Sequence, residues 1–142
     1  MPGERQRGFY SDAVDSDRVA VARAAYTCLN EADVDGLIEL LDPEVEYPDV
    51  VHDRTLHGKD AVDRHWRELL LRGDHSALPS EFFELGDAVV VVAYHQAYEK
   101  DGAPFGPGVA AVHRLTFRDN RIARIEFSAL DEIPEHVLAR LR

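Results

Sequence analysis

Tyr47 and His113 carry the side chains of this chain best suited to proton chemistry on an apolar background. The alternation around His113 places it on one face of a predicted strand with Ala111, Leu115 and Phe117. A histidine on an apolar face needs a hydrogen-bonding partner or a ligand, and imidazole exchanges protons near neutral pH. His113 is explained equally well as a proton-transfer group or as a histidine held by a backbone carbonyl or by Tyr47.

His95 is the second candidate for proton transfer. It shares the strand parity of Val89 and Val91, so we expect it to face the same interior as His113 and to orient a substrate or relay a proton. The alternative is a register slip at a bulge, which would turn His95 outward and bring Tyr94 and Tyr98 inward in its place.

Asp49 is the candidate carboxylate, because it has the parity of Tyr47 on a short strand. It would act as a general base if Pro48 rotates the strand toward the interior. The alternative is a solvated residue at the strand end, because aspartate is usually exposed and common in turns. We favour the solvated alternative.

Five apolar or aromatic side chains could form the wall of a ligand chamber. A flat or cyclic ligand would bind such a wall mainly through its area, whereas the same residues are ordinary core if the interior is filled. They are Tyr26, Trp66, Leu115, Phe127 and Leu130.

A metal site is not expected. His52, Asp53 and His57 form a loose cluster, but their spacing matches no tetrahedral site. We therefore expect no metal and no cofactor.

Three helices are predicted in the first half of the chain. Ser16 or Asp17 would cap the first, and Asp33 would cap a short second helix that ends at Pro43. The third runs from Lys59 to Arg72 on an apolar stripe.

The predicted strands alternate in the manner of an antiparallel sheet. A short strand carries Tyr47, and Pro48 within it favours an edge or a bulge. A polar loop follows through Asp53 and Gly58. Four further strands lie near 80–86, 88–99, 108–118 and 121–130, separated by turn signals such as Asp119-Asn120. This α-α-β-α-β-β-β-β order predicts an α+β cone, in which a strongly curved antiparallel sheet wraps around the helices.

The length of the chain predicts a single domain, at residues 16–142. We expect a flexible arm at residues 1–15 before it and a short helix at its C-terminal end. The chain has 142 residues, with 16 Lys plus Arg against 27 Asp plus Glu and a formal charge of -11. Because this charge repels phosphates and anionic lipids, we expect no nucleic-acid or membrane partner. Cys28 is the single cysteine, which suits a cytoplasmic protein without disulfides.

The chain resembles the nuclear transport factor 2-like superfamily, and in particular its SnoaL-like polyketide cyclase and ketosteroid isomerase branches. The resemblance runs from about residue 19 to residue 130. It rests on three segments, Leu29-Asn30-Glu31-Ala32-Asp33-Val34-Asp35-Gly36-Leu37, Pro43-Glu44-Val45-Glu46-Tyr47-Pro48 followed by Gly58-Lys59-Asp60-Ala61-Val62, and Leu115-Thr116-Phe117-Arg118-Asp119-Asn120-Arg121-Ile122.

The resemblance indicates which residues of this chain occupy the catalytic positions of ketosteroid isomerases, but those residues differ in chemistry from the isomerase residues. The aspartate base of ketosteroid isomerases falls at Tyr47, and the protonated aspartate of their oxyanion hole falls at His113. Their tyrosine donor falls at Ala25, or at Tyr26 if the alignment slips by one residue. A phenol with an ordinary pKa of about 10 is a poor base at neutral pH, so the standard isomerase mechanism is disfavoured.

Two functions follow as expectations. In the first, the chain binds an apolar small molecule, and Tyr47, His95 and His113 perform cofactor-independent isomerase, cyclase or dehydratase chemistry. In the second, it is a non-catalytic ligand-sensing or dimerisation module. The resemblance implies a homodimer formed through the outer sheet face, which carries Tyr94, Gln96, Tyr98, Arg114, Thr116 and Arg118.

Overall fold

A computed structural model of the chain describes residues 16–49, 52–73 and 75–129. The predicted N-terminal arm, Leu130 and the predicted C-terminal helix lie outside these described residues.

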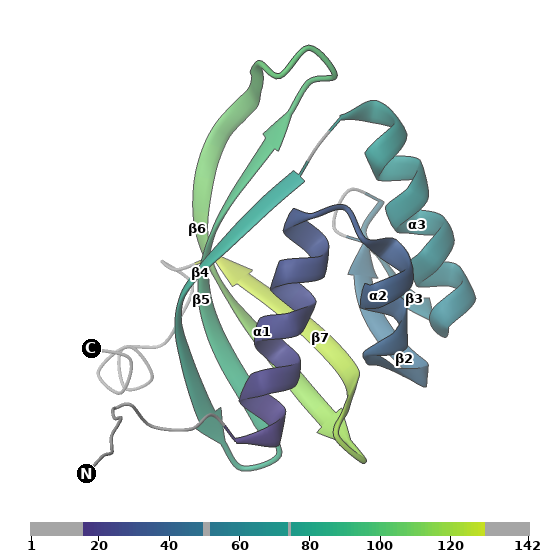
Figure 1. Cartoon of the computed structure of the whole chain (residues 1–142), viewed down its shortest axis with the longest axis vertical. Coiled ribbons are helices and arrows are strands. Elements are labelled where there is room, and N and C mark those ends of the chain that lie inside the picture. Colours follow the sequence, from purple (N-terminus) through teal and green to yellow (C-terminus); the bar gives the residue numbers. More distant parts are fainter. Residues whose placement is uncertain (1–15, 50–51, 74, 130–142) are drawn as a thin grey trace, which may run out of the picture.

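Three helices cover the concave face of a curved, unclosed sheet (Figure 1). Helix α1 spans Asp17–Asn30, α2 spans Val34–Glu39 and α3 spans Lys59–Arg72. The Ser16 hydroxyl accepts a hydrogen bond from the Val19 amide at 3.2 Å, and Asp33 accepts one from the Gly36 amide at 3.0 Å. These two hydrogen bonds confirm both predicted N-caps. The bounds of α3 also agree with the predicted helix from Lys59 to Arg72. No helix of the described segments is long and apolar enough to cross a membrane.

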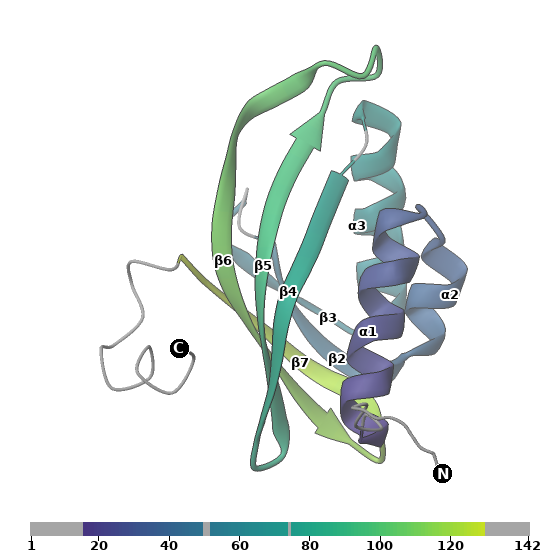
Figure 2. The same cartoon turned by 60° about the vertical axis from the view of Figure 1, so that its left-hand side comes forward.

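The sheet has six strands in the order β3-β2-β7-β6-β5-β4. The strands are β2 (Leu41–Asp49), β3 (Arg54–His57), β4 (His75–Leu85), β5 (Ala88–Tyr98), β6 (Pro104–Arg118) and β7 (Arg121–Ala129). Neighbours are antiparallel except for β2 and β7, which are parallel. Figure 2 shows how strongly β4, β5 and β6 bend around the helices. The predicted α+β cone is confirmed.

The strand that carries Tyr47 differs from its prediction. The second helix ends at Glu39, before Pro43, because the backbone carbonyl of Leu40 accepts a hydrogen bond from the Ile122 amide at 3.0 Å. Leu41 then enters the sheet beside Ile122. As a result β2 lies between β7 and β3 and is not an edge strand, although its register does shift between Leu41 and Glu46.

Strand β3 replaces part of the predicted polar loop. It has four residues, of which Leu56 is the buried one, so it shows too little alternation to be detected in the sequence. Strand β4 starts before the predicted residue 80 and contains Pro79. Proline is tolerated there because β4 is an edge strand and its register shifts between Pro79 and Glu81.

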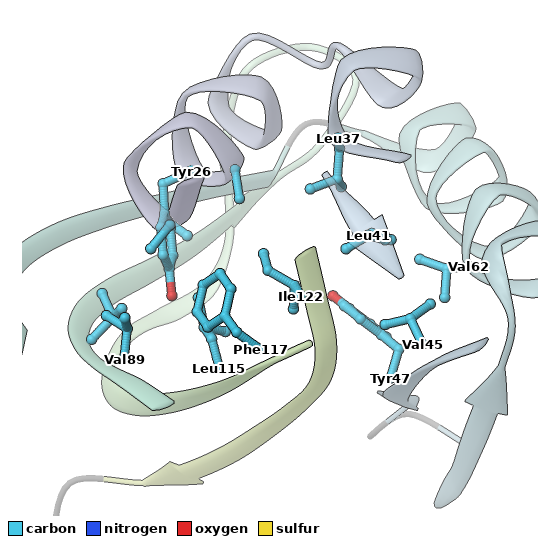
Figure 3. Close-up of a cluster of buried hydrophobic side chains, with 14 of the residues drawn as sticks. Tyr26, Leu37, Leu41, Val45, Tyr47, Val62, Val89, Leu115, Phe117 and Ile122 are labelled. Carbon is cyan, nitrogen blue, oxygen red and sulfur yellow. The ribbon is translucent and has the colours of Figure 1, made fainter. Parts of the chain in front are cut away.

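The main core lies between the helices and the inner sheet face. Figure 3 shows side chains from α1, α2, α3 and the sheet converging on Ile122 and Phe117. A second apolar cluster, centred on Val90 and Val112, has the opposite strand parity and therefore lies on the outer face. Because Tyr26 and Tyr47 belong to the main core, the candidate site is built into the tightly packed part of the fold.

Candidate functional site

His113 is held inside the cone by two side chains. It lies on β6 with 3% of its surface exposed. Its Nδ1 is hydrogen-bonded to the Tyr26 hydroxyl of α1, and its Nε2 lies 2.6 Å from Nε2 of His95 on β5. This relay of Tyr26, His113 and His95 joins one helix to two strands.

The geometry of the relay limits how its hydrogens can be shared. Two ring nitrogens 2.6 Å apart need one hydrogen and one lone pair between them. One consistent arrangement has Tyr26 donating to Nδ1 of His113, which then donates from Nε2 to His95. Burial raises the pKa of Tyr26 well above the range of a free phenol, so its hydroxyl stays neutral. The relay can pass a proton only by exchanging these donor and acceptor roles.

The inward orientation of His95 settles its strand register. His95 is half-buried and contacts His113, whereas Tyr94 is 50% exposed on the other face. A register shift does occur, but it falls between His95 and Ala97, beyond the histidine. The alternative that turned His95 outward is therefore wrong.

Aromatic rings pack around the relay. The Tyr26 ring stacks on His113 with centroids 5.7 Å apart and an interplanar angle of 5°. Phe127 lies 4.5 Å from the His113 ring and 5.9 Å from Tyr47. Trp66 contacts Tyr47 at 6.0 Å, and Leu115 is buried in the same core. The candidate wall residues lie together, apart from Leu130, which is outside the described residues.

Tyr47 is buried and contacts Phe127, which in turn contacts His113. It is Tyr26, rather than Tyr47, that holds the histidine. Burial raises the pKa of Tyr47 well above its usual range, and a hydrogen bond with Trp66 offsets this only in part. Tyr47 is therefore a hydrogen-bond donor at neutral pH and not a base.

Asp49 is buried, which corrects the expectation of a solvated strand-end residue. Its carboxylate accepts hydrogen bonds from His52 Nδ1 at 2.8 Å and from Arg54 Nε at 2.9 Å. Burial opposes ionisation, but these hydrogen bonds outweigh it and hold the pKa of Asp49 well below its usual range. A carboxylate so firmly ionised is a weak proton acceptor, so this geometry favours a structural role for Asp49.

The sequence reading missed His65 of α3. Its ring lies 5.7 Å from the Tyr47 ring, and its Nδ1 is 4.0 Å from the Asp49 carboxylate. Burial lowers the pKa of His65, so the imidazole is neutral at pH 7. The sequence signal that could have indicated His65 is its position next to Trp66, at the margin of the apolar stripe of this helix.

A hollow of about 510 Å³ opens at one end of the cone. Here β5 and β6 extend past the C-terminal end of α1 (Figure 2). Its lining consists of Leu29, Asn30, Glu31, Ala32, Leu70, Ser76, Tyr98 and Gly102. Tyr98, which was expected on the outer sheet face, is one of these lining residues.

The described residues contain no group of three or more His, Cys, Asp or Glu side chains arranged to hold a metal ion. His52 instead hydrogen-bonds Asp49.

Comparison with known proteins gives a family and a fold. A family model described as a SnoaL-like domain matches residues 22–125. An NTF2-like protein of unknown function from Burkholderia pseudomallei has a TM-score of 0.71 and 23% identity, covering 89% of this chain and 98% of that chain. A comparison with curated proteins finds no match.

Two similar structures contain small molecules. TerC, co-crystallised with polyporic acid, has a TM-score of 0.70 and 22% identity, covering 89% of this chain and 98% of that one. A Mycobacterium tuberculosis protein in complex with estradiol-17β-hemisuccinate has a TM-score of 0.70 and 16% identity, covering 82% and 97%. At these identities the similarity establishes the fold.

Proposed function

Because the chain belongs to the SnoaL-like domain family, we propose that it binds an apolar cyclic carbonyl compound and catalyses cofactor-independent proton transfer on it. The reaction class is that of an isomerase, cyclase or dehydratase. The observation that carries this proposal is the buried relay of Tyr26, His113 and His95.

His95 is the end of the relay assigned to the substrate, because it is half-buried whereas Tyr26 and His113 are buried. In the reversed arrangement, Nε2 of His95 donates to Nε2 of His113, and the lone pair on Nδ1 of His95 would take a proton from the carbon next to the carbonyl. The contact at 2.6 Å with His113 would then stabilise the positive charge on His95. In the same reversed arrangement Nδ1 of His113 donates to the Tyr26 oxygen, so the neutral hydroxyls of Tyr26 and Tyr47 each keep a hydrogen to donate to a developing oxyanion. The cyclic, oxygen-bearing ligands of two similar structures support this substrate class.

The test is deuterium exchange at the α-carbon of a bicyclic ketone, 2-tetralone, followed by NMR in D₂O. We expect the wild type to accelerate exchange over buffer, and His95→Gln and His113→Gln to lose on the order of a hundredfold of that acceleration. His57→Gln, which alters an exposed histidine of β3, is the matched control and should retain the full rate.

Two results would contradict the proposal. One is exchange by the wild type no faster than by buffer. The other is saturable ketone binding and exchange that His113→Ala leaves unchanged.

A second candidate function, a dimerisation or ligand-sensing module, is favoured by the outer sheet face. Leu78 is 57% exposed and is paired across β4 and β5 with Tyr94, which is 50% exposed. These side chains lie on the same face as the outer cluster of Val90 and Val112. We propose that a second copy of the chain covers this apolar surface.

A further inference from the structure

We infer that Asn30 and Gln96 are positioning residues, which keep His95 at hydrogen-bonding distance from His113. This inference rests on the proposed function and adds to it the groups that hold the proton-accepting histidine in place. Each amide side chain acts through a backbone segment that lies next to His95 in the sheet.

The sheet is irregular on both sides of His95. On one side, the pairing of β4 with β5 shifts register between Pro79 and Glu81. On the other side, the pairing of β5 with β6 shifts between His95 and Ala97. A register shift disrupts the ladder and leaves backbone groups without a strand partner. The sheet alone therefore fixes His95 less tightly than it fixes a residue in a regular ladder.

Asn30 stabilises the backbone on the β4 side. Ala77 of β4 is the direct strand partner of His95 and is fully buried. Asn30 Nδ2 donates to the Ala77 carbonyl at 2.9 Å, and the Ala77 amide donates to Asn30 Oδ1 at 2.8 Å. Asn30 follows Tyr26 by four residues, so the two side chains lie on the same face of α1. Because Tyr26 is hydrogen-bonded to His113, this helix face holds one histidine directly and the strand partner of the other.

Gln96 stabilises the backbone on the β6 side. Its Nε2 donates to the carbonyls of Ala97 and Gly106, each at 3.0 Å. Gly106 has φ of 72°, a left-handed conformation that belongs to this irregular part of β6. The Gln96 amide thus links β5, directly after His95, to the strand that carries His113.

The relay contact tolerates little displacement of either ring. The Nε2 atoms of His95 and His113 lie 2.6 Å apart. Hydrogen bonds weaken beyond about 3.2 Å, so a shift of His95 by roughly 1 Å would separate the two rings. Misplacement by about 1 Å in an active site can lower a rate by up to about a hundredfold.

The first experiment measures the relay in the ligand-free protein, as the NMR scalar coupling between the two Nε2 nuclei across their shared hydrogen. We expect the wild type to show this coupling, and Asn30→Ala and Gln96→Met to lose about half of it or more. Gln96→Lys, which restores a donor, should keep it. Ser80→Ala is the control, because it removes only the hydrogen bond from the Ser80 hydroxyl to the Val92 carbonyl, and it should also keep the coupling.

The second experiment measures α-carbon exchange of 2-tetralone. Asn30→Ala and Gln96→Met should each lower the rate at saturating ketone about tenfold and change the half-saturating concentration by less than about twofold. On a His95→Gln background the same substitutions should have no further effect, because their effect is transmitted through His95.

A wild type without the coupling, or unchanged coupling in the folded Asn30→Ala and Gln96→Met variants, would overturn the inference. A further loss of rate on the His95→Gln background would also overturn it, because the amides would then stabilise the fold without positioning the histidine. If Asn30→Ala fails to fold, Asn30→Asp removes the donor alone and gives the same comparison.

The two experiments separate this inference from the proposed function. A wild type that does not accelerate exchange contradicts the proposed function, whereas the coupling still decides whether the two amides position His95. Exchange that depends on His95 but is unaffected by Asn30→Ala and Gln96→Met would leave the proposed function standing without these positioning residues.

Discussion

His113 and Asp49 are both buried polar residues, and each is stabilised in a different way. His113 is hydrogen-bonded within the relay, between Tyr26 of α1 and His95 of β5. Asp49 is an anion that accepts hydrogen bonds from exposed residues of its own hairpin, His52 and Arg54. Removing a hydrogen-bonding partner of His113 therefore costs a buried hydrogen bond. The stabilisation that Asp49 provides depends instead on its ionisation and is lost in acid.

Tyr26→Phe should lower the free energy of unfolding by about 1–3 kcal/mol, because it removes the hydroxyl from a buried hydrogen bond to His113. Urea denaturation at pH 7 measures the change. Tyr94→Phe removes the same hydroxyl from an exposed tyrosine and should change stability by less than about 0.5 kcal/mol. Equal stabilities of the two variants would show that the hydrogen bond does not stabilise the fold.

Asp49→Asn should reduce the dependence of stability on pH in the acid range. The pKa of Asp49 is lower in the folded chain than the unfolded value of about 3.9, so its ionisation stabilises the fold above that pH. This stabilisation disappears as pH falls through about 4 toward the lower folded pKa. Urea midpoints at pH 7 and pH 3 should therefore differ more for the wild type than for Asp49→Asn.

Asp53→Asn is the matched control for this effect. Asp53 is an exposed residue of the same hairpin with φ of 51°, a conformation that asparagine also tolerates. It should keep the wild-type response to pH. An identical response in all three proteins would mean that Asp49 has no lowered pKa.

At the scale of elements, α1 is fastened to the edge of the sheet at both ends. Arg18 donates to the Gly86 carbonyl at 2.8 Å, in the turn between β4 and β5. Asn30 at the other end pairs with both backbone groups of Ala77 in the edge strand β4. Because an edge strand leaves backbone groups unpaired, the Asn30 amide serves as a short substitute for a further strand.

Asn30→Ala should loosen this end of β4. We expect the free energy of unfolding to fall by about 1–2 kcal/mol and the Ala77 amide to exchange hydrogen faster. Hydrogen exchange followed by NMR measures the second effect directly. Thr27→Ala, which removes an exposed hydroxyl bonded within α1, should leave Ala77 exchange unchanged. Slow exchange at Ala77 in the Asn30 variant would contradict the role of Asn30.

At the scale of the whole molecule, the sheet has an apolar cluster on each face. The inner cluster is covered by α1, α2 and α3. The outer one includes Val90 and Val112, and the exposed Leu78 and Tyr94 lie on the same face. A sheet with apolar side chains on both faces gains by covering the second one.

We therefore expect a homodimer that Leu78→Lys and Tyr94→Lys convert to monomers. Each substitution would bury a charge in the proposed interface. Sedimentation velocity at several protein concentrations measures the oligomeric state. Leu71→Lys, at a position of α3 that is 69% exposed, should leave the dimer intact. A wild type that stays monomeric at high concentration would refute the dimer.

Local signals in the sequence determined the helix caps, the bounds of α3 and the inward parity of His95 and His113. Ser16 and Asp33 cap helices through residues three positions away, and apolar alternation needs only one strand to be read. The SnoaL-like resemblance rested on similarly local strings, and the match of the family model to residues 22–125 confirms it.

Only the tertiary structure decided which groups meet. Tyr26 and His113 are 87 residues apart, and their contact depends on α1 packing against the bend of the sheet. The early end of α2 and the place of β2 inside the sheet follow from pairing with Ile122, far along the chain. The burial of Asp49 likewise needed β3, too short to show a pattern of its own. Such long-range contacts leave no periodic pattern in the sequence, because they form between side chains that only the folding of the chain brings together.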